Sequence, residues 1–169
     1  AQLIRRSIPY RFIGGVVLTR SAHVRDVLSL LRLARNQRDD LAWMRYLQLW
    51  PRIGEKTAER IIRRINGETD SADHIIELLR EELGTDHPGA VALAQTMGSY
   101  TDTAQCVREA TTALRPLLSQ RYDHWQQRAK DLELLEQVPR TSGSVGRFID
   151  DFTLEPMNDT QIANEHNDD

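Results

Sequence analysis

Apolar residues recur at helical spacing through most of this 169-residue chain, and this periodicity limits the possible fold more than any other feature. Leucines, valines and isoleucines fall three or four positions apart, which places them on one face of an α-helix. Prolines, glycines and capping residues interrupt the pattern at short intervals. The sequence therefore predicts a mainly α, bundle-like domain. Its predicted helices span residues 22–35, 40–49, 55–65, 72–83, 88–98, 102–115, 116–137 and 145–154.

Local signals set the bounds of these helices. Ser21 precedes the first helix, and Asp39 or Asp40 precedes the second, because such side chains accept hydrogen bonds from the free amides of a helix start. The pair Asn66-Gly67 predicts the end of the third helix. Pro116 leaves two alternatives open, either a new helix start or a kink in one long helix. The buried stripe expected for the second helix consists of Leu41, Met44, Leu47 and Leu49.

The two ends of the chain differ from the helical middle. Residues 8–18 are rich in β-branched and aromatic side chains around Gly14-Gly15, a pattern that predicts a short β segment of two strands. Residues 157–169 have almost no apolar content, which predicts a disordered tail or a linker. One glycine- and serine-rich loop is expected between residues 139 and 146.

The charge of the chain is divided unevenly. Residues 1–66 carry 14 Lys and Arg against 5 Asp and Glu, whereas residues 67–169 carry 8 against 20. A basic half of this kind favours a surface that faces a polyanion, with the acidic half as a solvated exterior. No apolar run is long enough for a membrane span. The single cysteine, Cys106, is expected to be a small buried side chain and fits a reducing, cytoplasmic location.

The segment at residues 51–57 joins the second and third predicted helices and has the clearest chemical signal. Gly54 is expected to adopt a positive φ angle and to let a ligand approach the backbone. The amides that open the third helix lack intrahelical acceptors, and helix starts of this kind bind anions. Backbone amides grip nucleic-acid phosphates in this way without reading bases. The predicted DNA-binding residues are Arg52, Ile53, Gly54, Glu55, Lys56, Thr57 and Arg60.

This pattern is typical of a helix-hairpin-helix element, with one departure. The usual form has glycine at both ends of its central triplet, and Arg52 occupies the first of those positions. The guanidinium is expected either to contact a phosphate in place of the backbone or to weaken the grip of the loop. The competing interpretation of residues 51–57 is an ordinary turn between two helices.

Other candidate sites are weak. The five histidines, His23, His74, His87, His124 and His166, show no metal-ligand spacing with cysteine or carboxylate, so no metal site is predicted. Trp43 and Trp50 lie seven positions apart on one helical face and are expected to pack in the core. No Gly-x-x-x-x-Gly-Lys-Ser/Thr phosphate loop occurs in the sequence, and neither catalytic nor cofactor-binding residues are predicted.

Several segments resemble, in their order and spacing, the UvrD/Rep-type superfamily 1 DNA helicases. They are IPYRFIGG at 8–15, VRDVLSLLRLARNQRDDLAWMRYL at 24–47 and PRIGEKTAERI at 51–61, followed by RYDHWQQRAKDLELL at 121–135 and FIDDFTLEP at 148–156. The resemblance covers nearly all of residues 1–156. It implies the 2B subdomain, a helical insertion in the second RecA-like motor domain of such a helicase.

The resemblance also implies a domain organisation and a function. Residues 1–18 would be the edge of the motor domain, 19–156 the helical 2B subdomain, and 157–169 the polar tail. The subdomain would bind double-stranded DNA or a fork junction through phosphates and regulate an ATP-dependent 3′–5′ helicase. ATP and Mg²⁺ would bind to motor subdomains of the same polypeptide, so this segment alone is expected to be inactive.

Two other functions remain open from the residues. One is a self-standing helix-hairpin-helix DNA-binding module of a repair or recombination protein. The other is an interaction platform whose acidic helices bind a protein partner and whose loop is only a turn.

Overall fold

The computed structural model describes residues 12–13, 16–68, 71–139 and 143–153, with side chains within 18–150 of those ranges. It confirms that the chain is mainly helical. A short 3₁₀ turn, Leu18–Arg20, leads into the helices. The α-helices of the described residues are α2 (Ala22–Arg35), α3 (Asp40–Gln48), α4 (Glu55–Glu68), α5 (Ala72–Leu83), α6 (Pro88–Gly98), α7 (Thr103–Arg121), α8 (Trp125–Gln137) and α10 (Val145–Thr153).

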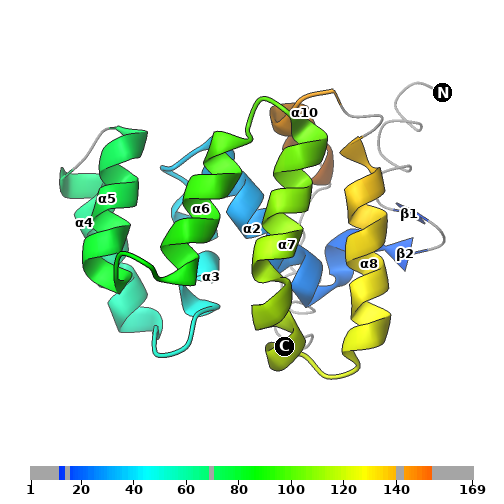
Figure 1. The fold of residues 1–169 in the computed structure, drawn as a ribbon, viewed down its shortest axis with the longest axis horizontal. Helices are drawn as coiled ribbons and strands as arrows, with labels where there is room; N and C mark the ends of the chain where they lie inside the picture. The colour runs from blue at the N-terminus through cyan, green and yellow to red at the C-terminus, as the bar shows by residue number, and fades with distance from the viewer. Residues whose placement is uncertain (1–11, 14–15, 69–70, 140–142, 154–169) are drawn as a thin grey trace.

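Helix α2 is the centre of the fold. Figure 1 shows α4 and α5 at one end of the molecule and α8 at the other, with α2 between them. Helices α3, α6, α7, α8 and α10 all pack against α2, and α5 lies between α4 and α6. Eleven of its 14 residues are buried, as expected for a helix that is covered on several sides. Its leucines and valines join one continuous core with side chains of the surrounding helices.

Two very short strands precede the helices. β1 (Phe12–Ile13) pairs antiparallel with β2 (Val16–Val17), and Phe12 lies opposite Val17. Leu18, the last residue of the predicted β segment, belongs to the 3₁₀ turn and not to a strand. Residues 8–11 and 14–15 of that segment lie outside the described residues, as does the predicted tail at 157–169.

Local capping residues define several helix bounds, although Ser21, at the predicted cap position before α2, makes no side-chain cap hydrogen bond. The Asp39 carboxylate accepts a hydrogen bond from the Ala42 amide at 3.0 Å, and the Ser71 hydroxyl accepts one from the His74 amide at 3.3 Å. Gly84 ends α5 with a φ of 114°, a left-handed value that favours glycine. Pro88 is the first residue of α6, where its missing N–H breaks no helical bond.

The buried face of α3 differs from the prediction. Leu41 is 85% exposed, and Met44 is only half-buried. Leu47 and Leu49 are buried, as predicted, but in the first turns of α3 the inward positions are held by two large rings, Trp43 and Tyr46, in place of Leu41 and Met44. Burial of an aromatic ring removes more apolar area from water than burial of a leucine. Trp43 and Trp50 are both buried, as expected.

One predicted helix end was wrong, and one open alternative is resolved. α4 continues through Asn66 and Gly67 to Glu68, so the predicted cap does not act as one. Pro116 does not start a new helix; it lies inside α7, in line with the alternative of a helix that runs through it, although this helix ends at Arg121 and not at residue 137. Leu114 and Leu118 are fully buried on either side of Pro116, and we attribute the continuity of the helix to this packing. The break between α7 and α8 falls at residues 122–124, where His124 adopts a left-handed φ of 56°.

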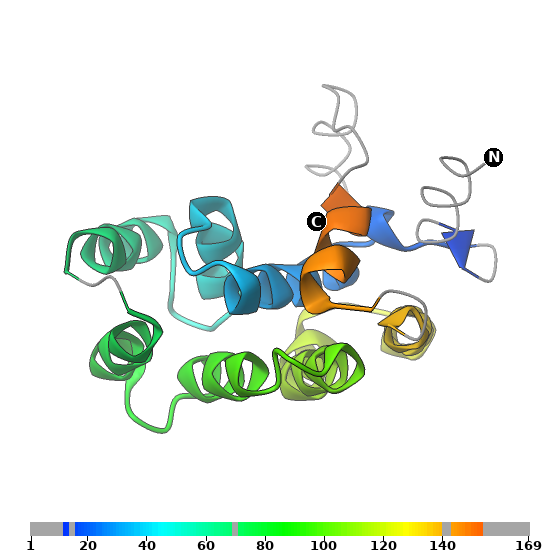
Figure 2. The ribbon, with the colours of Figure 1, turned by 90° about the horizontal axis from the view of Figure 1, so that it is seen from above.

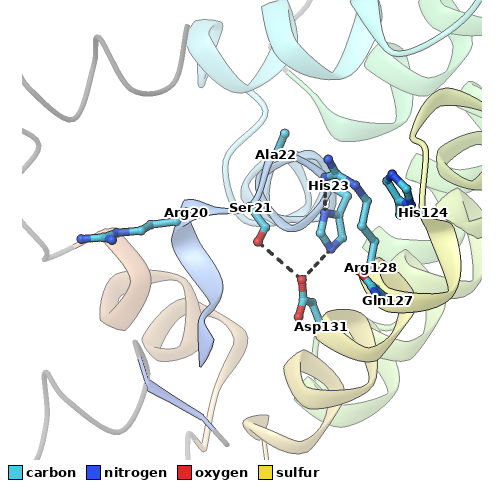
Figure 3. A pocket seen from close by; sticks show the side chains of 8 residues that line it. All are labelled: Arg20, Ser21, Ala22, His23, His124, Gln127, Arg128 and Asp131. Atoms are coloured by element: carbon cyan, nitrogen blue, oxygen red, sulfur yellow. Dashed lines mark hydrogen bonds and ion pairs between the residues drawn. The ribbon is translucent and has the colours of Figure 1, made fainter. Parts of the chain in front are cut away.

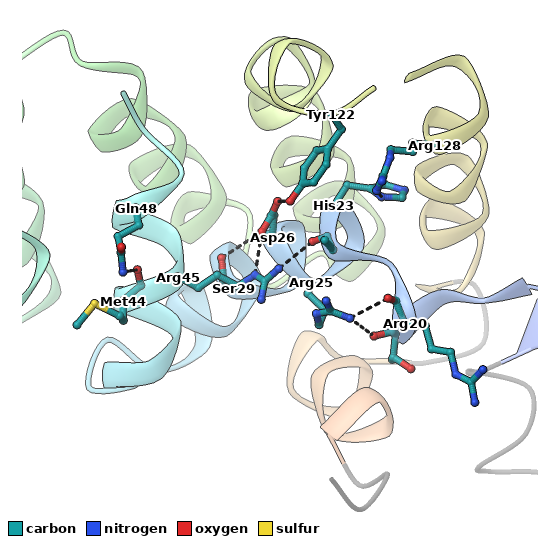
Figure 4. Close-up of polar contacts among 12 residues, drawn as sticks. Arg20, His23, Arg25, Asp26, Ser29, Met44, Arg45, Gln48, Tyr122 and Arg128 are labelled. Carbon is teal, nitrogen blue, oxygen red and sulfur yellow. Dashed lines mark hydrogen bonds and ion pairs between the residues drawn. The ribbon is translucent and has the colours of Figure 1, made fainter. Parts of the chain in front are cut away.

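Buried polar contacts connect α2 to its neighbours around Asp26. This carboxylate is about 2% exposed and accepts hydrogen bonds from Arg45 Nε at 2.8 Å and from the Tyr122 hydroxyl at 2.6 Å (Figure 4). Arg45 also donates to the Ala22 carbonyl at 3.1 Å. A buried carboxylate is tolerated only when it is paired and hydrogen-bonded. Asp26 therefore fixes α3 and the end of α7 relative to α2.

The last described helix, α10, returns to the first one. α10 packs against α2, and Figure 2 shows the two helices side by side. Phe148 and Ile149 are buried and belong to the same core. Arg35, the last residue of α2, forms an ion pair with Asp150 and donates a hydrogen bond to the Gly146 carbonyl at 3.3 Å.

Candidate nucleic-acid interface

The loop between α3 and α4 is anchored in the core at its first residues. Trp50 is buried, and its ring lies edge-on to those of Tyr46 and His87, with centroids 6.0 and 5.4 Å away. Gly89 permits this packing, because a Cβ there would come within 2.9 Å of the Trp50 indole nitrogen. Ile53 packs partly against the core from the other side of the loop. The loop is therefore held on a packed support.

The backbone of this loop corrects one prediction. Gly54 does not have a positive φ angle; Arg52 does, at 72°. The only other non-glycine residue with a positive φ in the described part of the chain is His124. Left-handed backbone costs a non-glycine residue roughly 1–2 kcal/mol. The position that usually holds glycine therefore keeps the conformation for which glycine is suited, although an arginine occupies it.

The start of α4 presents free amides to solvent. The Ala58 amide donates to the Gly54 carbonyl at 3.0 Å, which is the first bond of the helix. Among the described residues, no acceptor is found for the amides of Glu55, Lys56 and Thr57. Gly54, Glu55 and Lys56 are exposed, and a Cβ added to Gly54 would meet nothing within 4 Å. The helix N-terminus is thus accessible to an anion, which its dipole would favour.

The cations around this helix start fall into two groups. Arg52, Lys56 and Arg63 are exposed, and the described residues provide no carboxylate within ion-pair distance of them. Arg60 and Arg64, in contrast, form ion pairs with glutamates of α5. Thr57 is half-buried beside them. The structure therefore brings the predicted residues together in one surface but neutralises Arg60 within the fold.

Glu82 is the centre of these ion pairs. Arg60 Nη1 donates to both of its carboxylate oxygens, at 2.8 and 2.9 Å, and Arg64 Nη1 donates to Oε2 at 3.0 Å. Partial burial alone would raise the pKa of Glu82, but the hydrogen bonds from the two guanidinium groups outweigh it and lower that pKa. The carboxylate is therefore ionised at neutral pH.

These contacts change the interpretation of the charge asymmetry. Acidic residues of the second half do not only solvate the exterior, because several of them pair with basic residues of the first half. Local sequence offers no signal for such pairs, since the partners lie far apart in the chain. They include Arg35–Asp150, Arg60–Glu82 and Arg64–Glu81.

A second polar region lies at the opposite end of the molecule. A cavity of about 480 Å³ opens between the start of α2 and helix α8, and Arg20, His124 and Arg128 are among its lining residues (Figure 3). Asp131 points into it, with its carboxylate 3.0 Å from His23 Nε2 and 3.4 Å from the Ser21 hydroxyl. The dipole of α2 favours a negative charge at its N-terminus, and the Asp131 carboxylate already supplies one.

No pattern in the sequence indicates the role of His23 in this region. It is 1% exposed, and its Nδ1 lies 3.0 Å from Arg128 Nη1. Burial lowers the pKa of His23 more than the nearby Asp131 carboxylate raises it. The imidazole is therefore neutral at physiological pH, and its role is to connect α2 with α8.

Two further features bear on function. Cys106 is fully buried, as predicted, and burial raises the pKa of its thiol to about 12. Within the described ranges, no cluster of three or more His, Cys, Asp or Glu side chains has the arrangement of a metal site. Every helix that the structure describes is too short or too polar to cross a membrane.

Comparison with known proteins places the chain in a family. The sequence model of the UvrD-like helicase C-terminal domain matches residues 1–159. DNA helicase II of Haemophilus influenzae is 39% identical over 67 residues, which cover 39% of this chain and 9% of that protein. The chain thus aligns with less than a tenth of that relative's length. No solved structure matches the chain. Because the family model spans most of its length, the chain belongs to the UvrD-like helicase C-terminal domain family.

Proposed function

We propose that this chain is the accessory 2B subdomain of an ATP-dependent 3′–5′ DNA helicase and binds duplex DNA without sequence preference. The α3–loop–α4 segment would act as its helix-hairpin-helix element. The observation that carries the proposal is the exposed start of α4, where three amides find no acceptor in the described part of the chain and Arg52 and Lys56 lie beside them. Membership of the helicase family supports DNA as the polyanion.

In this proposal the amides hold one phosphate and the cations hold its neighbours. Gly54 leaves room for the sugar-phosphate backbone, since, its chain neighbours aside, no atom of the described residues lies within 4 Å of its vacant Cβ position. Lys56 is in the first turn of α4, where its ammonium adds positive charge to that of the helix dipole. Such contacts position a duplex but carry no sequence information. ATP and Mg²⁺ belong to motor residues outside this chain, whose sequence lacks a phosphate loop.

The proposal is tested by titrating the full 169-residue chain with a fluorescent DNA duplex at several salt concentrations. We expect weak binding, with a log–log salt slope that reflects a few phosphate contacts. Lys56→Glu should abolish most binding, because it places a negative charge beside the amides. Lys130→Glu, at an exposed position on α8, is the matched control and should bind like the wild type.

Two results would contradict the assignment. If Lys56→Glu and Lys130→Glu weaken binding equally, the effect is one of net charge and the loop is not the site. If the wild-type chain has no affinity for duplex DNA even at low salt, the interaction-platform interpretation is favoured. Circular dichroism of each variant establishes that its helices remain intact.

A further inference from the structure

We propose that Glu82 of α5 competes with DNA for Arg60 and Arg64 and thereby limits the affinity of the interface. The inference rests on the proposed function, because it concerns the regulation of the same surface. It identifies an acidic residue on a neighbouring helix, outside the predicted site, as a determinant of how tightly that site binds phosphate.

Arg60 lies on the same face of α4 as Lys56. Lys56 and Arg60 are four residues apart and therefore lie on the same face of the helix. Lys56 belongs to the first turn, so Arg60 is the next cation beyond the free amides on that face. A phosphate chain that follows this face from the helix start would meet Arg60 after Lys56.

The ion pairs with Glu82 interrupt this basic surface. The Glu82 side chain is 11% exposed, whereas the side chain of Arg60 is 55% exposed. Arg60 uses only Nη1 for Glu82, which leaves its Nε and Nη2 donors directed elsewhere. The guanidinium can therefore rotate toward a phosphate, but it must give up, or share its charge with, a carboxylate that is already in place. Because the Arg60 side of this ion pair is open to solvent, the pair is weak enough for such an exchange.

Arg64 is held more firmly than Arg60. Besides Glu82, it contacts Glu68 at 2.8 Å and Glu81 at 2.5 Å. Removing the Glu82 charge therefore frees Arg60 fully and Arg64 only in part. The effect on DNA binding should accordingly pass mainly through Arg60.

Duplex titrations of Glu82→Gln test this competition, with Glu77→Gln as the matched control. Both substitutions remove one negative charge from α5, but among the described residues Glu77 forms its ion pair with Arg80 of its own helix, at 3.6 Å, and not with a cation of α4. We expect Glu82→Gln to bind duplex DNA about three- to tenfold more tightly at low salt, with a salt slope steeper by up to roughly one unit. Glu77→Gln should bind within about twofold of the wild type.

A double variant tests whether the gain in DNA affinity depends on Arg60. In the Arg60→Gln background, Glu82→Gln should lose most of its gain if the competition is for Arg60. Equal gains from Glu82→Gln and Glu77→Gln would reduce the effect to net charge and overturn the inference. An unchanged affinity of a folded Glu82→Gln chain would also overturn it, whereas absence of binding by the wild type would refute the proposed function instead. Thermal unfolding of each variant confirms that α4 and α5 remain packed.

Discussion

Arg52 offers the sharpest separation between folding and binding. Its φ angle of 72° lies in the left-handed region, which costs an arginine roughly 1–2 kcal/mol. Glycine adopts this conformation freely but loses more backbone entropy on folding, by roughly 0.5–1 kcal/mol relative to alanine. Arg52→Gly should therefore stabilise the fold by about 0.5–1 kcal/mol, which corresponds to roughly 1–4 °C in melting temperature for a domain of this size.

Binding should change in the opposite direction. If the Arg52 guanidinium contacts a phosphate, its removal should lower the log–log salt slope of duplex binding by about one unit. Arg52→Ala is the control, since it removes the same charge but keeps the strained backbone. It should lose as much affinity as Arg52→Gly without the gain in stability.

The two measurements are thermal unfolding and duplex titration of the same three proteins. A melting temperature of Arg52→Gly at or below that of Arg52→Ala would refute the argument from backbone strain. Unchanged salt slopes for both variants would show that the arginine is retained for a reason other than phosphate contact. Strained backbone at a loop tip is often associated with function, and this pair of variants tests that association directly.

Two further predictions concern stability. Asp26→Asn should destabilise the fold by about 3 kcal/mol, because it leaves Arg45 without its buried carboxylate. Asp150→Asn should cost less than about 1 kcal/mol, because its ion pair with Arg35 is more exposed. Equal losses of unfolding free energy in chemical denaturation would contradict this reasoning. His23 and His87 have lowered pKa values in the fold, mainly through burial, so the unfolded chain takes up protons first as the pH falls below about 6.5. Stability should therefore decline from pH 7 to pH 5, and His23→Gln should flatten that decline; a wild-type profile that is flat or rises toward pH 5 would refute the assignment.

Helix positions were largely predictable because their signals are local. Asp39, Ser71, Gly84 and Pro88 each act on backbone groups within a few residues, so their effect does not depend on the rest of the fold. Pro116 was not predictable in this way. Whether a proline ends a helix depends on how well the flanking turns are packed, and that packing comes from distant helices.

In the candidate site, too, the features set by local sequence were predictable and those set by distant packing were not. The free amides follow from the start of α4, which the sequence located correctly. The conformations of Arg52 and Gly54 did not follow, because a φ angle in a short loop depends on how the chain on either side of it packs, and here Trp50 at the base of the loop is buried against distant residues. The pairing of Arg60 with Glu82 did not follow either, since it depends on how α5 packs against α4.

The return of α10 to α2 makes the core depend on a segment that comes late in the chain. Arg35, at the end of α2, contacts both Gly146 and Asp150, and Phe148 and Ile149 of α10 are buried in the same core. The central helix would therefore keep an uncovered apolar side until residues near 150 had been added, so that a chain truncated before α10 should not complete its fold.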